Sequence, residues 1–266
     1  MLRKKILILL ALVLGLGFLA GCGNKEELET IRLGVNSDED EVWKLIASQL
    51  REEGVRLEII SFGDYTRPNL ALAEGEIDLN AFQHYAFFNK FKEEHGLDLT
   101  AIGETVIAPL GIYSKKIESL GELDQGATIA LPNDESNLAR GLVLLERAGL
   151  LELEKKELPG LKDIRKNSLD LEIKELDASI IARALEDVDA AIINSGFAVD
   201  SGLNPREDSI FLEPIDEASR PYINIIAART EDRDREIFKK IVSLYQTDEV
   251  EELIDEIYGG GQEVAW

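Results

Sequence analysis

The 266-residue chain has one cysteine and two histidines, and it lacks the short motifs that mark common enzymes. A lone cysteine, Cys22, excludes an intramolecular disulfide, so a hydrophobic core must stabilise the fold. The histidines have no cysteine partner and no metalloprotease-type spacing, so we expect no metal site. A Gly-x-Ser-x-Gly elbow, a Walker loop and a dinucleotide-type glycine fingerprint are also missing. We therefore expect no catalytic residues, no cofactor, and a protein that is not an enzyme.

Positive charge is scarce as well. The chain has 29 Lys and Arg residues against 52 Asp and Glu residues, which gives a formal net charge of -23. A chain of this charge repels nucleic acid and anionic lipid surfaces, so we expect no nucleic-acid partner. The excess of carboxylates favours solubility and by itself indicates no ligand.

The longest apolar run lies at the N-terminus, where residues 6–20 follow three cations. This run suits a signal-peptide core and is shorter than the roughly 20 residues of a membrane span. It ends in Leu-Ala-Gly-Cys at residues 19–22, which resembles a lipobox whose cysteine thiol receives a diacylglycerol. We expect residues 1–21 to be a lipoprotein signal peptide and residues 22–30 a tether. Cys22 would then hold the domain at the extracytoplasmic face of the cell membrane. An uncleaved anchor helix with an incidental cysteine is the alternative.

Beyond the tether, short apolar runs alternate with amphipathic stretches. Strands are predicted at residues 31–35, 55–62 and 77–82, with helices at 39–53 and 68–75 between them. This βαβαβ order predicts a parallel sheet covered by helices on both faces. The apolar run at residues 106–113 contains Pro109 and Gly111, so we interpret it as a crossing into a second lobe.

A second α/β series follows. Strands are predicted at residues 127–131, 171–176 and 189–194, and helices at 135–148 and 179–185. We interpret residues 223–228 as the crossing back and residues 232–258 as a helical tail. The expected domains are lobe 1 at residues 31–108 and 226–266, and lobe 2 at residues 109–225. Ligands of open α/β sheets bind beyond the carboxyl ends of the strands, so the cleft between the lobes is the expected site.

Several side chains at predicted strand ends are candidates for that site. Arg140 follows the first turn of a predicted helix, where a guanidinium can bind a carboxylate through two parallel hydrogen bonds; a solvated surface arginine is the alternative. His84 is either a ligand contact or an ordinary histidine at a helix N-terminus. Asn194 and Asn224 either cap turns or fix the polar groups of an amino acid.

Aromatic residues are concentrated after the third predicted strand, at positions 82, 85, 87, 88 and 91. Aromatic side chains at such spacing belong to a core more often than to a pocket. The sequence leaves open which of them, Phe82 and Phe87 included, face a ligand.

Five stretches and one asparagine carry a resemblance to a known family, in this order along the chain: YTRPNLAL at 65–72, NAFQH at 80–84, IYSKK at 112–116, TIALPND at 128–134 followed by Arg140, DVDAAIIN at 187–194, and Asn224. Together with the lipobox they resemble the methionine-binding lipoprotein family of the NlpA type. Its members are the substrate-binding subunits of methionine-uptake ABC transporters. The resemblance extends over essentially the whole chain.

The resemblance implies a type II periplasmic-binding-protein-like fold, in which two α/β lobes joined by two crossings close on a ligand. It implies that Arg140 clamps a carboxylate and that His84, Asn194 and Asn224 contact the ligand. Tyr65 and Phe82 would contact the thioether, a soft and polarizable group. The implied partners are methionine, an ABC permease with its ATPase, and the membrane through a lipid anchor.

The sequence departs from the family pattern near the expected site. Phe87 stands where members often have a tyrosine, Gly196 where they usually have a second asparagine, and residues 36–40 are unusually acidic. These differences bear on selectivity, so a methionine-containing dipeptide or another small amino-acid-like solute is the alternative ligand. An extracellular enzyme and a structural lipoprotein with a vestigial cleft are the alternatives from other classes.

Overall fold

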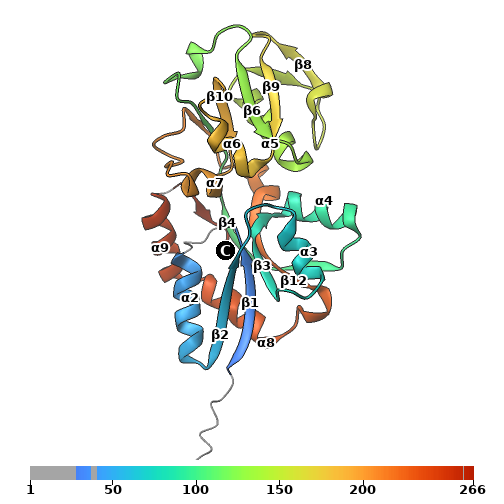
Figure 1. Cartoon of the computed structure of the whole chain (residues 1–266), viewed down its shortest axis with the longest axis vertical. Coiled ribbons are helices and arrows are strands. Elements are labelled where there is room, and N and C mark those ends of the chain that lie inside the picture. Colours follow the sequence, from blue (N-terminus) through green and yellow to red (C-terminus); the bar gives the residue numbers. More distant parts are fainter. Residues whose placement is uncertain (1–27, 37–40, 260) are drawn as a thin grey trace, which may run out of the picture.

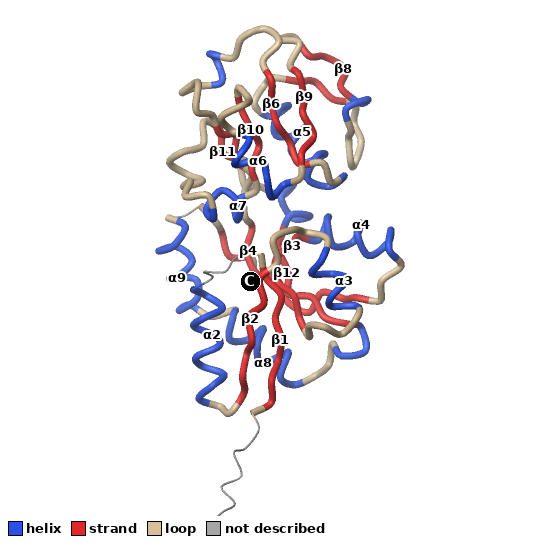
Figure 2. The backbone as a smooth tube through the Cα atoms, in the orientation of Figure 1, coloured by secondary structure: helices blue, strands red, loops and turns tan. Residues whose placement is uncertain are grey.

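The computed structural model describes residues 28–36, 41–259 and 261–266. The predicted signal peptide, Cys22, most of the predicted tether and residues 37–40, which include the three acidic residues of the 36–40 segment, lie outside this range. The described chain forms two α/β lobes, one above the other in Figure 1, as the sequence predicts. Figure 2 shows strands at the centre of each lobe with helices around them.

The lower lobe is built on a six-stranded sheet in the order β13-β4-β12-β3-β1-β2. Its strands are β1 (Glu29–Val35), β2 (Val55–Ser61), β3 (Leu79–His84), β4 (Leu99–Ile107), β12 (Ile223–Arg229) and β13 (Glu263–Val264). Its helices are α2 (Glu41–Glu52), α3 (Arg67–Ala73), α4 (Tyr85–His95), α8 (Glu236–Tyr245) and α9 (Asp248–Tyr258).

The predicted βαβαβ unit is present, and β1 pairs in parallel with both β2 and β3. Helix α2 buries Val42, Trp43, Ile46 and Leu50, which recur at helical spacing along one face. The sheet as a whole is mixed, because β12 runs antiparallel to β3 and to β4.

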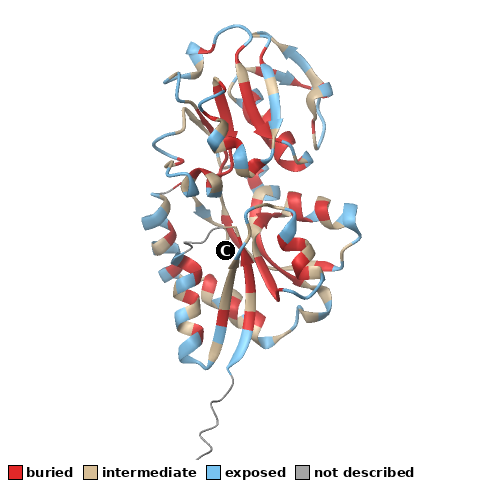
Figure 3. Cartoon of the chain, in the orientation of Figure 1, coloured by how far each residue is buried: buried red, intermediate tan, exposed pale blue. Residues whose placement is uncertain are grey.

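The upper lobe contains a five-stranded sheet in the order β11-β5-β10-β6-β9 and a separate hairpin of β7 and β8. Its strands are β5 (Gly111–Tyr113), β6 (Thr128–Pro132), β7 (Leu151–Leu153), β8 (Ile164–Asn167), β9 (Glu172–Leu176), β10 (Ala190–Ile193) and β11 (Phe211–Leu212). Its helices are α5 (Glu135–Arg147), α6 (Ala178–Ala184) and α7 (Ser195–Asp200). Buried residues concentrate in the strands of both lobes (Figure 3).

The first crossing lies where the sequence predicts it, at residues 108–110 between β4 and β5. The second prediction is wrong. Residues 223–228 lie within β12, a central strand of the lower sheet, and the chain returns to the lower lobe through residues 213–222. The predicted boundary at residues 225/226 therefore falls inside a strand. An apolar run alone does not distinguish a buried central strand from a buried linker.

The tail is helical but not continuous. Helix α8 ends at Tyr245, and α9 starts at Asp248 after Thr247, whose hydroxyl accepts a hydrogen bond from the Val250 amide. This N-cap begins a new helix, so the predicted helical tail consists of two helices separated at residues 246–247. Among the described residues, no helix has the length and apolar character needed to span a membrane.

Candidate functional site

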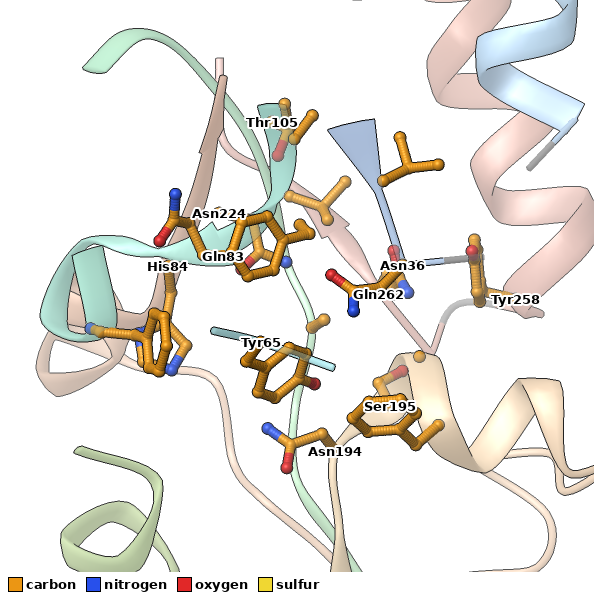
Figure 4. A pocket seen from close by; sticks show the side chains of 18 of the residues that line it. Asn36, Tyr65, Gln83, His84, Thr105, Asn194, Ser195, Asn224, Tyr258 and Gln262 are labelled. Atoms are coloured by element: carbon orange, nitrogen blue, oxygen red, sulfur yellow. The ribbon is translucent and has the colours of Figure 1, made fainter. Parts of the chain in front are cut away.

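A cavity of about 150 Å³ lies between the two lobes. Side chains from four strands of the lower sheet (β1, β3, β4 and β12), from α2, α4, α5, α7, α8 and α9, and from the C-terminal segment line it. Figure 4 shows Tyr65 near its centre, between Gln83 and His84 on one side and Asn194 and Ser195 on the other. All seven predicted ligand-binding residues are among those that line it: Tyr65, Phe82, His84, Phe87, Arg140, Asn194 and Asn224. The structure therefore brings the predicted residues together, while their contacts with a ligand stay a prediction.

One wall of the cavity is aromatic. The Tyr65 ring centroid lies 5.8 Å from those of Phe82 and Phe87, and 4.9 Å from that of Phe197 on the other lobe. Rings at these separations attract one another and provide a polarizable surface. Phe88, by contrast, packs in the core of the lower lobe.

His84 stands at a helix N-terminus and also faces the cavity. It is the N-cap of α4, where its Nδ1 accepts a hydrogen bond from the Phe87 amide at 3.1 Å, and its side chain also lines the cavity. Nε2 lies 3.3 Å from Asn137 Oδ1. These two partners assign the neutral tautomer with its proton on Nε2. Burial, followed by the nearby Arg140 charge, lowers the pKa of His84 to about 3, so the ring is uncharged at neutral pH.

Asn137 connects the two sides of the cavity. Its Nδ2 donates to Oδ1 and Oδ2 of Asp134, both at 3.0 Å. Its Oδ1 accepts from Asn194 Nδ2 at 2.8 Å and also faces His84. A bond network thus extends from the α5 N-terminus in the upper lobe to β3 in the lower lobe.

Three polar atoms in the cavity wall are buried without a hydrogen-bond partner among the described residues: Asn36 Oδ1, Asn194 Oδ1 and Ser195 Oγ. Buried polar atoms are nearly always paired, because leaving one unpaired costs about 1–3 kcal/mol. These atoms are available to hydrogen-bond a polar molecule in the cavity.

Arg140 is buried, with only 2% of its side chain exposed, so the surface alternative is wrong. The carboxylate it binds belongs to the protein. Nε donates to Glu213 Oε1 at 3.0 Å and Oε2 at 3.1 Å, and Nη2 donates to Glu213 Oε2 at 2.5 Å and to the Ala108 carbonyl at 3.0 Å. The edge of the guanidinium that would hold a ligand carboxylate through two parallel bonds is therefore occupied. Nη1 remains the guanidinium nitrogen without a hydrogen bond to the described residues.

Sequence reasoning missed several residues at this site. Glu213 follows the short strand β11, and neither motif nor spacing relates it to Arg140, 73 positions earlier. Tyr222, whose ring lies 4.2 Å from the Arg140 guanidinium carbon, ends the return crossing. Phe197 follows the predicted Asn194 within one helical turn, so a search for aromatic residues after that strand would have found it.

The described residues contain no group of three or more His, Cys, Asp or Glu side chains placed to hold a metal ion. The cavity offers an aromatic wall, one guanidinium, one carboxylate and several amide and hydroxyl groups. Such a surface is suited to binding a small solute that is polar at one end and apolar at the other.

Comparisons with known proteins agree with this geometry. The profile of the family described as NlpA lipoprotein matches residues 31–266. The D-methionine-binding lipoprotein MetQ of Salmonella typhi is 39% identical over 255 residues, covering 93% of this chain and 93% of that protein. A nutrient binding protein from Burkholderia cenocepacia bound to methionine has a TM-score of 0.84 at 38% identity, covering 89% of this chain and 100% of that one. The substrate binding protein of a methionine transporter from Streptococcus pneumoniae has a TM-score of 0.84 at 37% identity, covering 89% and 96%.

The family match includes both lobes, both crossings and every described residue that lines the cavity. The chain is 37–39% identical in sequence to the relative and the solved structures named above, which is well above the level at which proteins share only a fold. The chain belongs to the NlpA lipoprotein family.

Proposed function

We propose that this protein is the substrate-binding lipoprotein of an ABC importer and that it binds methionine in the cavity between its lobes. Its relatives support this role: one is named as a D-methionine-binding lipoprotein, and a solved neighbour is the substrate binding protein of a methionine transporter. A second neighbour was solved bound to methionine.

The single observation that carries the proposal is the two-ended character of the cavity. Aromatic rings of Tyr65, Phe82 and Phe87 form one side, while the unpaired Asn194 Oδ1 and the Arg140 guanidinium belong to another. A zwitterionic amino acid with an apolar side chain complements both. The volume of about 150 Å³ is well below the roughly 300–1,000 Å³ of clefts that hold drug-sized ligands, which favours a single amino acid.

The proposed contacts follow from this arrangement. The thioether of methionine lies against Tyr65 and Phe82, since sulfur packs favourably near aromatic rings. The charged end faces Asn194, Asn224 and Nη1 of Arg140, a nitrogen that has no hydrogen bond to the described residues. Because the ligand touches both lobes, only the closed arrangement gains all of these contacts, and binding favours closure.

In the cell, we expect lipid-modified Cys22 to hold the protein at the outer face of the membrane. The closed, loaded form would deliver its ligand to a permease driven by an ATPase. The predicted signal peptide and the lipobox of the sequence support this location.

Identification of the bound solute tests the proposal. Protein expressed as residues 23–266 is denatured, and the released small molecules are identified by mass spectrometry. Refolded protein is then titrated calorimetrically with both enantiomers of methionine and with other amino acids. Recovery of a different solute, or no binding of either enantiomer, contradicts the proposal.

A methionine-containing dipeptide is the second candidate ligand. A neighbouring cavity of about 250 Å³ shares Tyr65, Phe87 and Phe197 with the first and would accommodate a second residue. Competition between methionine and methionine-containing dipeptides distinguishes the two ligands, because tighter binding of a dipeptide favours this candidate.

A further inference from the structure

The Arg140–Glu213 pair is the feature of the cavity that the proposed function leaves unexplained. A carboxylate clamp for a ligand needs an available guanidinium, yet this one already holds a carboxylate of the protein. Only 2% of the Arg140 side chain and 9% of the Glu213 side chain are exposed. A buried pair of this kind is a poor device for stability, since apolar residues of similar size serve as well or better.

The pair is held rigidly from several directions. Glu213 Oε2 also accepts a hydrogen bond from the Leu110 amide at 2.9 Å, and Arg140 Nη2 donates to the Ala108 carbonyl. Tyr222 lies over the face of the guanidinium. Ala108 and Leu110 belong to the first crossing, and Glu213 and Tyr222 belong to the second. Both crossings therefore fix the guanidinium, with Nη1 as its nitrogen not bonded to the described protein.

The charges around the cavity do not favour an anion. Glu213 balances Arg140, and Asp200 also lines the cavity. The pKa of the Tyr65 hydroxyl depends on the same charges. Burial is the main cause that raises its pKa, the charges of Asp134, Asp200 and Asp177 raise it further, and Arg140 alone opposes them. Four charged side chains thus act on the Tyr65 hydroxyl, and three of them are carboxylates.

We propose that Glu213 is a specificity-determining residue, which cancels the charge of Arg140 so that the cavity accepts a zwitterion and rejects a net anion. This inference rests on methionine binding in the cavity. It implies that the ammonium group of the ligand contributes more to recognition than the carboxylate does. If Arg140 acted as a simple clamp for the ligand, the carboxylate would contribute more to recognition than the ammonium group.

The wild-type protein gives the first test. Calorimetric titrations at slightly acidic pH compare L-methionine with two analogues, the cationic L-methioninamide and the anionic desamino acid 4-(methylthio)butanoate. We expect methioninamide to bind more tightly than the desamino acid by about tenfold, the order of effect of one unbalanced charge at short range. Equal binding, or tighter binding of the desamino acid, overturns the proposal. This comparison needs no variant, so it stands even if a variant fails to fold.

The variant Glu213→Gln gives the second test, because it keeps the shape of the side chain and removes its charge. The ratio of desamino-acid affinity to methioninamide affinity should rise about tenfold. General damage to the fold would weaken both analogues alike and leave the ratio unchanged. An unchanged ratio in a folded variant overturns the proposal.

Asp216→Asn is the matched control. Asp216 forms an ion pair with Arg147 at 2.9 Å. Like the Arg140–Glu213 pair, this pair joins α5 to the second crossing, but it lies outside the cavity. The ratio of desamino-acid affinity to methioninamide affinity in Asp216→Asn should equal that of the wild type. If the wild-type protein binds no methionine, the proposed function fails and this inference falls with it. If methionine binds but the ratios do not move, the inference alone fails.

Discussion

Removal of the Arg140 guanidinium should destabilise the protein far more than removal of an exposed arginine. Arg140→Met leaves the buried Glu213 carboxylate with the Leu110 amide as its one hydrogen-bond donor among the described residues. Breaking a buried ion pair by deleting one member costs about 3–5 kcal/mol, because an uncompensated charge remains out of water. For a chain of this size, about 1 kcal/mol corresponds to roughly 2–4 °C in melting temperature, so we expect a decrease of about 10 °C.

Urea and thermal unfolding followed by circular dichroism, without ligand, measure this effect. The double variant Arg140→Met/Glu213→Gln removes both charges and should recover most of the lost stability. Arg147→Met is the control, since the Arg147 and Asp216 side chains are 30% and 49% exposed and such pairs contribute about 0–1 kcal/mol. The reasoning is refuted if Arg140→Met melts like the control, or if the double variant is as unstable as the sum of the two single variants.

Three further predictions concern ligand affinity and pH. Tyr65→Ala should weaken methionine binding about tenfold by calorimetry, since it removes one wall of the cavity, whereas Tyr85→Ala, outside the cavity, should not. The pKa of His84 is lowered to about 3, so its contribution to stability is complete above about pH 6.5 and is lost as the pH falls toward 3. Urea unfolding at a series of pH values should therefore show wild type losing about 1 kcal/mol more than His84→Asn per pH unit below pH 6, and parallel curves would contradict this. Lys90 bonds Glu135 on the opposite lobe at 2.9 Å, so Lys90→Met should weaken methionine binding a few-fold at low salt and not at high salt, where screening removes the pair.

Much of the fold follows from local patterns in the sequence. The periodicities predict β1, α2, β2, α3 and the alternating elements of the upper lobe within a few residues, because each of these buries one regular face. Two features of the fold do not follow from these patterns, for a common reason. The strand β12 and a buried linker both consist of apolar residues, and the break between α8 and α9 depends on a single capping threonine. Local propensity does not decide either case.

The seven site residues were identified through family resemblance and their positions at strand ends, and the cavity contains all of them. Burial of Arg140 was not predictable from its helix. On a helical wheel of α5, Leu138, Leu142 and Leu145 lie on one face and Arg140 lies on the opposite face. The two crossings cover the face that carries Arg140, so both faces of the helix are buried.

By itself, the sequence determined the chain's two α/β series, its excess of carboxylates and the family to which its motifs correspond. Only the tertiary structure decided which charges meet. Glu213 and Arg140 are 73 positions apart and become partners because the two crossings between the lobes run side by side at the cavity. Pairing of buried charges depends on where chain segments cross in space, and no periodicity along the chain encodes that crossing.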